Sequence, residues 1–115
     1  MRMSDEEYFR SCVAKERRLA QLLGRHDIEE FYENAGTLWE GAHALPQWTR
    51  DWSACGALIA EYEIPISYHP EAGAVSAGSV NVSFSDHPSR EQAIRFAVVK
   101  AVIALLEHRA HHGGH

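Results

Sequence analysis

The segment from Ser89 to His108 constrains the fold of this chain most strongly, because as a helix it would be apolar on nearly every side. Lys100 is the only charged residue between Arg95 and Glu107. A helix that is apolar all round is normally buried. We therefore expect one face of this helix to cover a sheet and another to meet the N-terminal helices of the same chain.

A second copy of the chain is the alternative cover for this helix. Obligate homodimer interfaces resemble a domain core cut in half, and an apolar C-terminal helix is suited to such a seam. A homodimer through the C-terminal helix therefore stays open as a second hypothesis.

The N-terminal part of the chain predicts a helical hairpin. Ser4 and Glu7 have the spacing of a capping box, and an apolar stripe of helical period follows them. The same spacing recurs at Asp27 and Glu30, which predicts a short second helix over 28–35. The apolar face of that second helix would consist of Ile28, Phe31, Tyr32 and Ala35.

Residues 36–50 are interrupted by glycine and proline, yet they hold too many large apolar side chains for a solvated linker. One interpretation is a loop folded over the core, in which the tryptophans fill volume. The other is an exposed aromatic patch that binds a partner, because tryptophan is enriched at interface hot spots. The candidate partner-binding residues in the second interpretation are Trp39, Leu45, Trp48 and Trp52.

The second half predicts a helix, a small sheet and the closing helix. Thr49 or Asp51 can cap a helix that runs to about residue 62. The period then changes from 3.6 to 2 over 64–68 and again over 80–84. Val75 and Ala77 can extend the second of these strands backwards, with Gly78 as a bulge or a break.

These elements predict an α+β fold. We expect an N-terminal helical hairpin, a helix, an antiparallel sheet of two or three strands and a long buried C-terminal helix. Residues 1–108 would form one domain, followed by a flexible tail at 109–115 that is rich in histidine and glycine.

Charge argues against a dedicated nucleic-acid binder. The net charge is −5, with −2 in residues 1–50 and −3 in residues 51–115. Neither half is therefore a basic arm or an acidic tail that would bind a charged partner. The order of elements after residue 52 is that of a double-stranded-RNA-binding domain. That module needs several basic residues at the start of its last helix, and here Arg90 alone is present.

Histidine is the one compositional oddity, with eight in the chain. If the last helix continued, His108, His111 and His112 would share one face, and the spacing of the first and third suits a metal. The following Gly113 and Gly114 favour instead a frayed tail that binds zinc or nickel adventitiously. We expect no cofactor.

The sequence contains no known catalytic motif: it lacks a nucleophile elbow, a phosphate-binding glycine loop and a His-Glu-x-x-His helix. Adjacent Asp86 and His87 resemble an acid–base pair, but a helix cap explains Asp86 better. Cys12 and Cys55 are expected to be small buried residues. We expect a non-enzymatic protein.

The N-terminus is acidic without an apolar core, and the longest apolar run, 101–106, is too short to span a membrane. We therefore expect a cytoplasmic location without membrane association.

The second half resembles the NinX-like family of small phage and prophage proteins. The resemblance rests on the following residues: Asp51, Trp52, Gly56, Leu58, Ile59, Glu61, Ile64 and Ile66, with Pro88, Ala93, Ile94, Val98 and Val99 in the closing segment. The chain departs from the family in having no tryptophan in 75–84 and Gly56-Ala57 in place of Gly-Pro. The resemblance implies a phage or prophage origin in a bacterial host, and it carries no catalytic residues over to this chain.

The function expected from these features is a non-catalytic interaction module that modulates a host or phage protein. A self-associating structural protein and a metal-binding protein that uses the C-terminal histidines are the alternatives.

Overall fold

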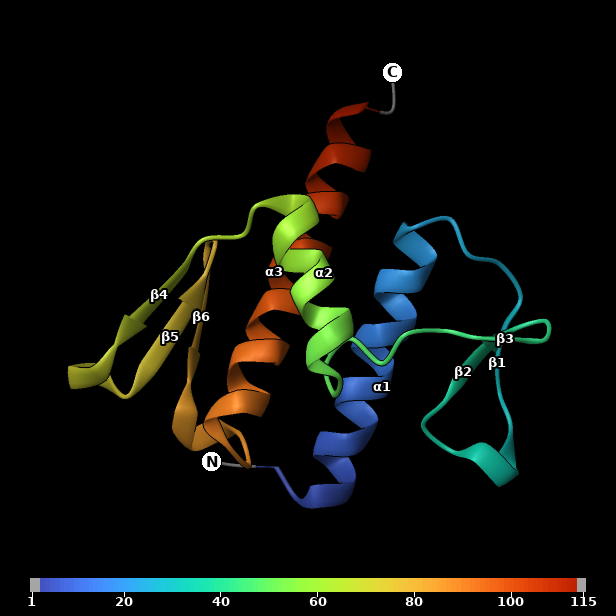
Figure 1. Cartoon of the computed structure of the whole chain (residues 1–115), viewed down its shortest axis with the longest axis horizontal. Coiled ribbons are helices and arrows are strands. Elements are labelled where there is room, and N and C mark those ends of the chain that lie inside the picture. The colour runs from blue at the N-terminus through green and yellow to red at the C-terminus, as the bar shows by residue number, and fades with distance from the viewer. Residues whose placement is uncertain (1–2, 114–115) are drawn as a thin grey trace.

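The computed structural model describes the backbone of residues 3–113 and the side chains of residues 3–110. It confirms a mixed α+β fold, with a layer of helices between two antiparallel sheets (Figure 1). The α-helices are α1 (Asp5–Leu22), α2 (Trp52–Tyr62) and α3 (Arg90–Gly113). The first sheet contains β1 (Ile28–Glu30), β2 (Leu38–Glu40) and β3 (His43–Ala44). The second contains β4 (Ile66–His69), β5 (Ala74–Ala77) and β6 (Val80–Ser83). Short 3-10 helices are η1 (Tyr32–Asn34), η2 (Pro70–Ala72) and η3 (Phe84–Asp86).

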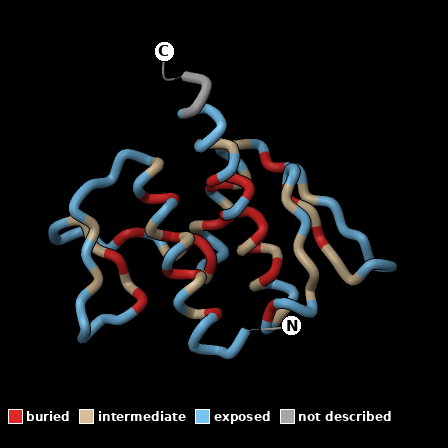
Figure 2. Tube along the Cα trace, turned by 180° about the vertical axis from the view of Figure 1, so that it is seen from behind, coloured by how far each residue is buried: buried red, intermediate tan, exposed pale blue. Residues whose placement is uncertain are grey.

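Helix α3 lies at the centre of the molecule and is covered by other parts of the same chain. It packs against α1 and α2 on one side and against β5 and β6 on the other. Its residues between 93 and 103 supply much of the core, and the buried part of the trace is concentrated in these helices (Figure 2). The prediction that this apolar helix is covered within one chain is therefore confirmed for that stretch. The helix continues to Gly113, so the segment expected to be a tail from residue 109 is helical in its described part.

Helix α1 begins as predicted. The Ser4 hydroxyl accepts a hydrogen bond from the Glu7 amide at 3.2 Å, and the Glu7 carboxylate accepts one from the Ser4 amide at 3.0 Å. These reciprocal bonds satisfy two amides that the first turn leaves without helical partners.

The predicted second helix over 28–35 is wrong, and with it the N-terminal helical hairpin. Residues 28–30 form β1, which pairs antiparallel with β2, and only a single 3-10 turn follows. Asp27 has φ +55° and so lies outside the helical region. Glu30 does not take part in a capping box, because its carboxylate contacts Arg10 and the Gly36 amide.

Residues 36–50 contain the strands β2 and β3 as well as a loop folded over the core. Leu45, Trp48 and Thr49 are buried within that loop. The volume-filling interpretation therefore holds for Trp48, while the strands were not expected from the pattern.

The second half follows the prediction closely. The Asp51 carboxylate caps α2 by accepting from the Ser53 amide at 3.0 Å, and the Ser89 hydroxyl accepts from the Gln92 amide at 3.1 Å at the start of α3. The segment 74–77 is a separate central strand, because Gly78 (φ +56°) makes a tight turn into β6.

Among the described residues, no helix combines the length and the apolar character that crossing a membrane requires.

Candidate functional site

The four residues predicted to bind a partner do not share one surface. Leu45 and Trp48 belong to the buried core, so they offer no area to a partner of the folded chain. Trp39 is half-buried in β2. Trp52 is 44% exposed at the start of α2, where the Arg95 guanidinium lies 4.9 Å from its ring centre. Core packing therefore takes Leu45 and Trp48, whereas Trp52 and part of Trp39 remain accessible.

The exposed aromatic surface lies instead on residues 26–44, which we call the arm. Tyr32 is 96% exposed and the adjacent Phe31 is 41% exposed. The Phe31 and Trp39 rings lie 6.4 Å apart, and Glu29 pairs with Trp39 across β1 and β2. The indole N–H of Trp39 is shielded from solvent and meets no acceptor among the described residues. Phe31, Trp39 and Glu29 thus form a continuous outer face that ends at Tyr32.

The charge of the chain is concentrated on the arm. The arm contains five acidic residues and no lysine or arginine: Asp27, Glu29, Glu30, Glu33 and Glu40. The remainder of the chain then holds 11 acidic and 11 basic residues, so the whole net charge of −5 lies in the arm. The net charge of residues 1–50 is only −2 because this half of the chain also contains arginines that precede and follow the arm.

Two of the five carboxylates are bonded to the body of the protein. Glu30 accepts from both terminal nitrogens of Arg10 at 3.2 and 2.7 Å and from the Gly36 amide at 2.7 Å. The Arg10 bonds and then the Gly36 amide lower the pKa of Glu30 to about 2. Glu40 pairs with Arg25 at 3.3 Å. Among the described residues, neither Glu29 nor Glu33 has an ion pair, and both are exposed.

A buried network fixes the arm to the helices. The Glu16 carboxylate, on α1, accepts from the Thr49 hydroxyl and amide and from the Arg50 guanidinium. Arg50 also donates to the Gly36 carbonyl in the arm. Gly36 has φ +91° and is pressed against the Phe9 ring, where an added Cβ would lie 2.4 Å from the nearest ring carbon. The arm is therefore held in one orientation rather than hinged freely.

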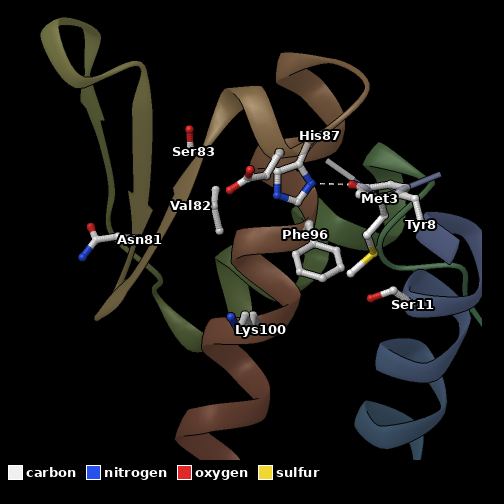
Figure 3. A pocket seen from close by; sticks show the side chains of 10 residues that line it. Met3, Tyr8, Ser11, Asn81, Val82, Ser83, His87, Phe96 and Lys100 are labelled. Atoms are coloured by element: carbon white, nitrogen blue, oxygen red, sulfur yellow. Dashed lines mark hydrogen bonds between the residues drawn. The ribbon is translucent and has the colours of Figure 1, made fainter. Parts of the chain in front are cut away.

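A second candidate region is a cleft of about 400 Å³ between α1, β6 and α3 (Figure 3). Tyr8 and His87 are buried in its wall, and the Tyr8 hydroxyl lies 2.6 Å from Nδ1 of His87. The Phe96 ring lies 5.0 Å from the His87 ring, and Lys100 lies lower on the same face of α3. Burial lowers the pKa of His87; the negative charge of Asp86 partly opposes this effect, and the positive charge of Lys100 adds to it.

Within the described residues that line this cleft, His87 is bonded to a tyrosine and no serine is bonded to a histidine. A serine–histidine contact exists elsewhere, on the second sheet, where His69 Nε2 lies 2.7 Å from the Ser76 hydroxyl. The same hydroxyl also contacts the side-chain oxygen of Asn81 on the neighbouring strand β6.

Asp86 is not the helix cap that the sequence predicted. It ends η3, and Ser89 caps α3 instead. Cys12 and Cys55 are free and buried, as predicted. Burial raises the pKa of both thiols, that of Cys55 to about 11.

The predicted metal-binding histidines lie partly outside the described side chains, which end before His111 and His112. His108 is exposed near the end of α3. Within the described residues, no three histidine, cysteine or carboxylate side chains are grouped as metal ligands.

The order α2, β4, β5, β6, α3 is the helix–strand–strand–strand–helix order noted in the sequence. At the start of α3, Arg90 is exposed, whereas Arg95 is buried and donates to the Thr49 carbonyl. One exposed arginine at that position is a weak phosphate-binding surface.

Sequence reasoning missed the arm because the residues around Tyr32 fit a helical apolar face equally well. It missed the Tyr8–His87 pair because 79 positions separate the two residues. The charge of the arm is a property of the sequence alone, because residues 26–44 contain five acidic residues and no lysine or arginine.

Comparisons with protein-family models, curated proteins and solved structures give no match to this chain.

Proposed function

We propose that this chain is a non-catalytic protein-binding module whose contact surface is the outer face and tip of the arm. The observation that carries the proposal is Tyr32, a large aromatic side chain that is 96% exposed beside the exposed Phe31. Exposed aromatic side chains grouped together are typical of interaction sites, where tyrosine and tryptophan supply most of the binding energy.

The attachment of the arm supports this proposal. Ordering a loop at an interface reduces affinity, and a surface held in place beforehand avoids that cost. Bonds from Arg10, Arg17 and Arg50 reach the arm backbone or its carboxylates.

The NinX-like resemblance of the second half favours a phage- or prophage-encoded protein that acts on a host protein in the bacterial cytoplasm. The arm lies outside the residues that carry the resemblance. We propose that the second half supplies the scaffold and that the arm supplies the specificity.

Affinity capture from a bacterial host lysate tests the proposal when wild-type protein is compared with two tyrosine variants. Tyr32→Ala should lose a stoichiometric partner that wild-type protein retains. Tyr68→Ala is the matched control, because Tyr68 is 61% exposed but lies on β4, at the edge of the other sheet. The partner should then bind again when both components are purified.

Loss of the partner with Tyr68→Ala but not with Tyr32→Ala would move the interaction site to the second sheet. If wild-type protein captured no stoichiometric partner from lysates with or without added salt, the proposal that the chain is a protein-binding module would be contradicted.

A further inference from the structure

We infer that the arm recognises a basic protein segment, rich in arginine or lysine, which lies across Tyr32 and the carboxylates of Glu29 and Glu33. This inference rests on the proposed function and adds the chemistry of the partner.

Residues 26–44 contain five carboxylates and no lysine or arginine. Two of these carboxylates pair with Arg10 and Arg25 from outside the arm, so a charge of −3 remains on the arm. Arg10 and Arg25 neutralise Glu30 and Glu40, and they do so through side chains on the inner face of the first sheet. Glu29 and Glu33 therefore present uncompensated charge on the exposed side of the arm, where it complements a cationic partner.

The most exposed aromatic side chain of the arm, Tyr32, precedes Glu33 directly in the chain. An exposed tyrosine ring attracts a guanidinium or ammonium group through the negative potential of its face. The protein already uses this contact beside the arm, since the Arg10 guanidinium lies 4.9 Å from the centre of the Phe9 ring while its nitrogens bond Glu30. Tyr32 and the adjacent Glu33 are both exposed, and within the described residues Glu33 has no ion pair and no cation lies over the Tyr32 ring.

The hollow between the arm and α1 measures about 410 Å³ and is lined by Phe9, Phe31 and Tyr32 together with Glu6, Glu30 and Arg10. Arg10 already pairs with Glu30 there at 2.7 Å, so the protein itself supplies the cation of this hollow. The cations of a partner segment are therefore expected on the exposed carboxylates of Glu29 and Glu33.

A titration with a hexa-arginine peptide tests this inference by NMR, with a hexa-glutamate peptide and a single-stranded RNA oligonucleotide as comparison probes. We expect amide shifts confined to the arm with hexa-arginine alone, and a loss of affinity as salt rises from 50 to 300 mM. Glu29→Gln/Glu33→Gln should weaken the binding about 3- to 10-fold, the effect of two exposed ion pairs.

The matched control is Glu71→Gln/Glu91→Gln, which changes the net charge equally at two exposed positions outside the arm. It should leave the affinity for hexa-arginine unchanged. Tyr32→Leu, which keeps apolar area but removes the ring, should weaken binding, whereas Tyr68→Leu should not. Circular dichroism of each variant checks that the fold is retained.

Shifts spread over the body, equal losses in the two double variants, or tighter binding of RNA than of hexa-arginine would each overturn the inference. If a captured partner depends on Tyr32 but hexa-arginine does not bind the arm, the proposed protein-binding function is retained. The inference that the partner segment is basic is then rejected.

Discussion

The Tyr8 hydroxyl lies 2.6 Å from Nδ1 of His87 and joins the first turn of α1 to the segment that leads into α3. Both side chains are buried, and the Tyr8 and Phe96 rings enclose the imidazole at centre distances of 5.3 and 5.0 Å. Neutral His87 with its proton on Nε2 accepts a hydrogen bond from the Tyr8 hydroxyl at Nδ1, whereas protonated His87 would have to donate there and would carry a charge into an apolar wall.

This pair predicts a pH dependence of stability. Burial lowers the pKa of His87 in the folded state below the usual 6.5, so the unfolded chain binds the proton more readily. The stability from neutral His87 is fully present above about pH 6.5 and is lost as pH falls through the folded pKa. Urea unfolding between pH 5 and 8 should show a smaller slope of stability against pH for His87→Gln than for wild-type protein. His69→Gln, which removes an exposed histidine, should keep the wild-type slope, and equal slopes in all three proteins would contradict the assignment.

Gly36→Ala should destabilise the protein through the junction of the arm. A residue other than glycine at φ +91° costs about 1–2 kcal/mol, and the collision with Phe9 adds roughly 1–3 kcal/mol. Gly24→Ala is the control, because Gly24 has φ +88° with nothing near its missing Cβ, and it should show the backbone cost alone. Unfolding in urea measures both, and equal losses would mean that Phe9 does not hold the arm.

Glu16→Gln should weaken the attachment between α1 and the loop before α2. It leaves Arg50 without the carboxylate that it contacts at 2.5 Å, and breaking a buried ion pair costs roughly 3–5 kcal/mol. The lower end of that range is expected, because the Arg50 side chain is still 22% exposed. Glu107→Gln, which removes the exposed pair with Arg18, should cost less than about 1 kcal/mol. A small effect of Glu16→Gln in chemical denaturation would show that the network does not stabilise the fold.

Both thiols should be unreactive in the folded protein. The thiolate is the reactive species, and burial raises the pKa of Cys55 to about 11 and that of Cys12 above its ordinary value. An aromatic disulfide reagent at pH 8 should titrate two thiols at once in guanidinium chloride and neither rapidly in native buffer. Rapid modification of one thiol in the native state would indicate that the core opens locally.

The elements predicted correctly are those with local signals. The Ser4–Glu7 box, the Asp51 cap and the alternation before and after Gly78 each depend on neighbours within a few positions. These interactions are encoded in short segments, so a single sequence reveals them.

The arm was mispredicted because its decisive contacts are long-range. Asp27 and Glu30 have the spacing of a capping box, but Glu30 bonds to Arg10, 20 positions earlier. Nothing local distinguishes a carboxylate that caps a helix from one that pairs with a distant arginine. The candidate site depended on the same segment, so its residues moved from the tryptophans of the loop to Tyr32 and its acidic neighbours.

Three of the five arm carboxylates have no ion pair within the described residues, so the arm concentrates negative charge on one side of the molecule. Such a molecule experiences a torque as well as a force near a charged surface, and it rotates before it touches. It should therefore meet a cationic surface with the arm leading, so that fewer encounters occur in unproductive orientations. Added salt would shorten the range of this alignment to about 10 Å at 0.1 M, and association would then slow even if the bound complex were unchanged.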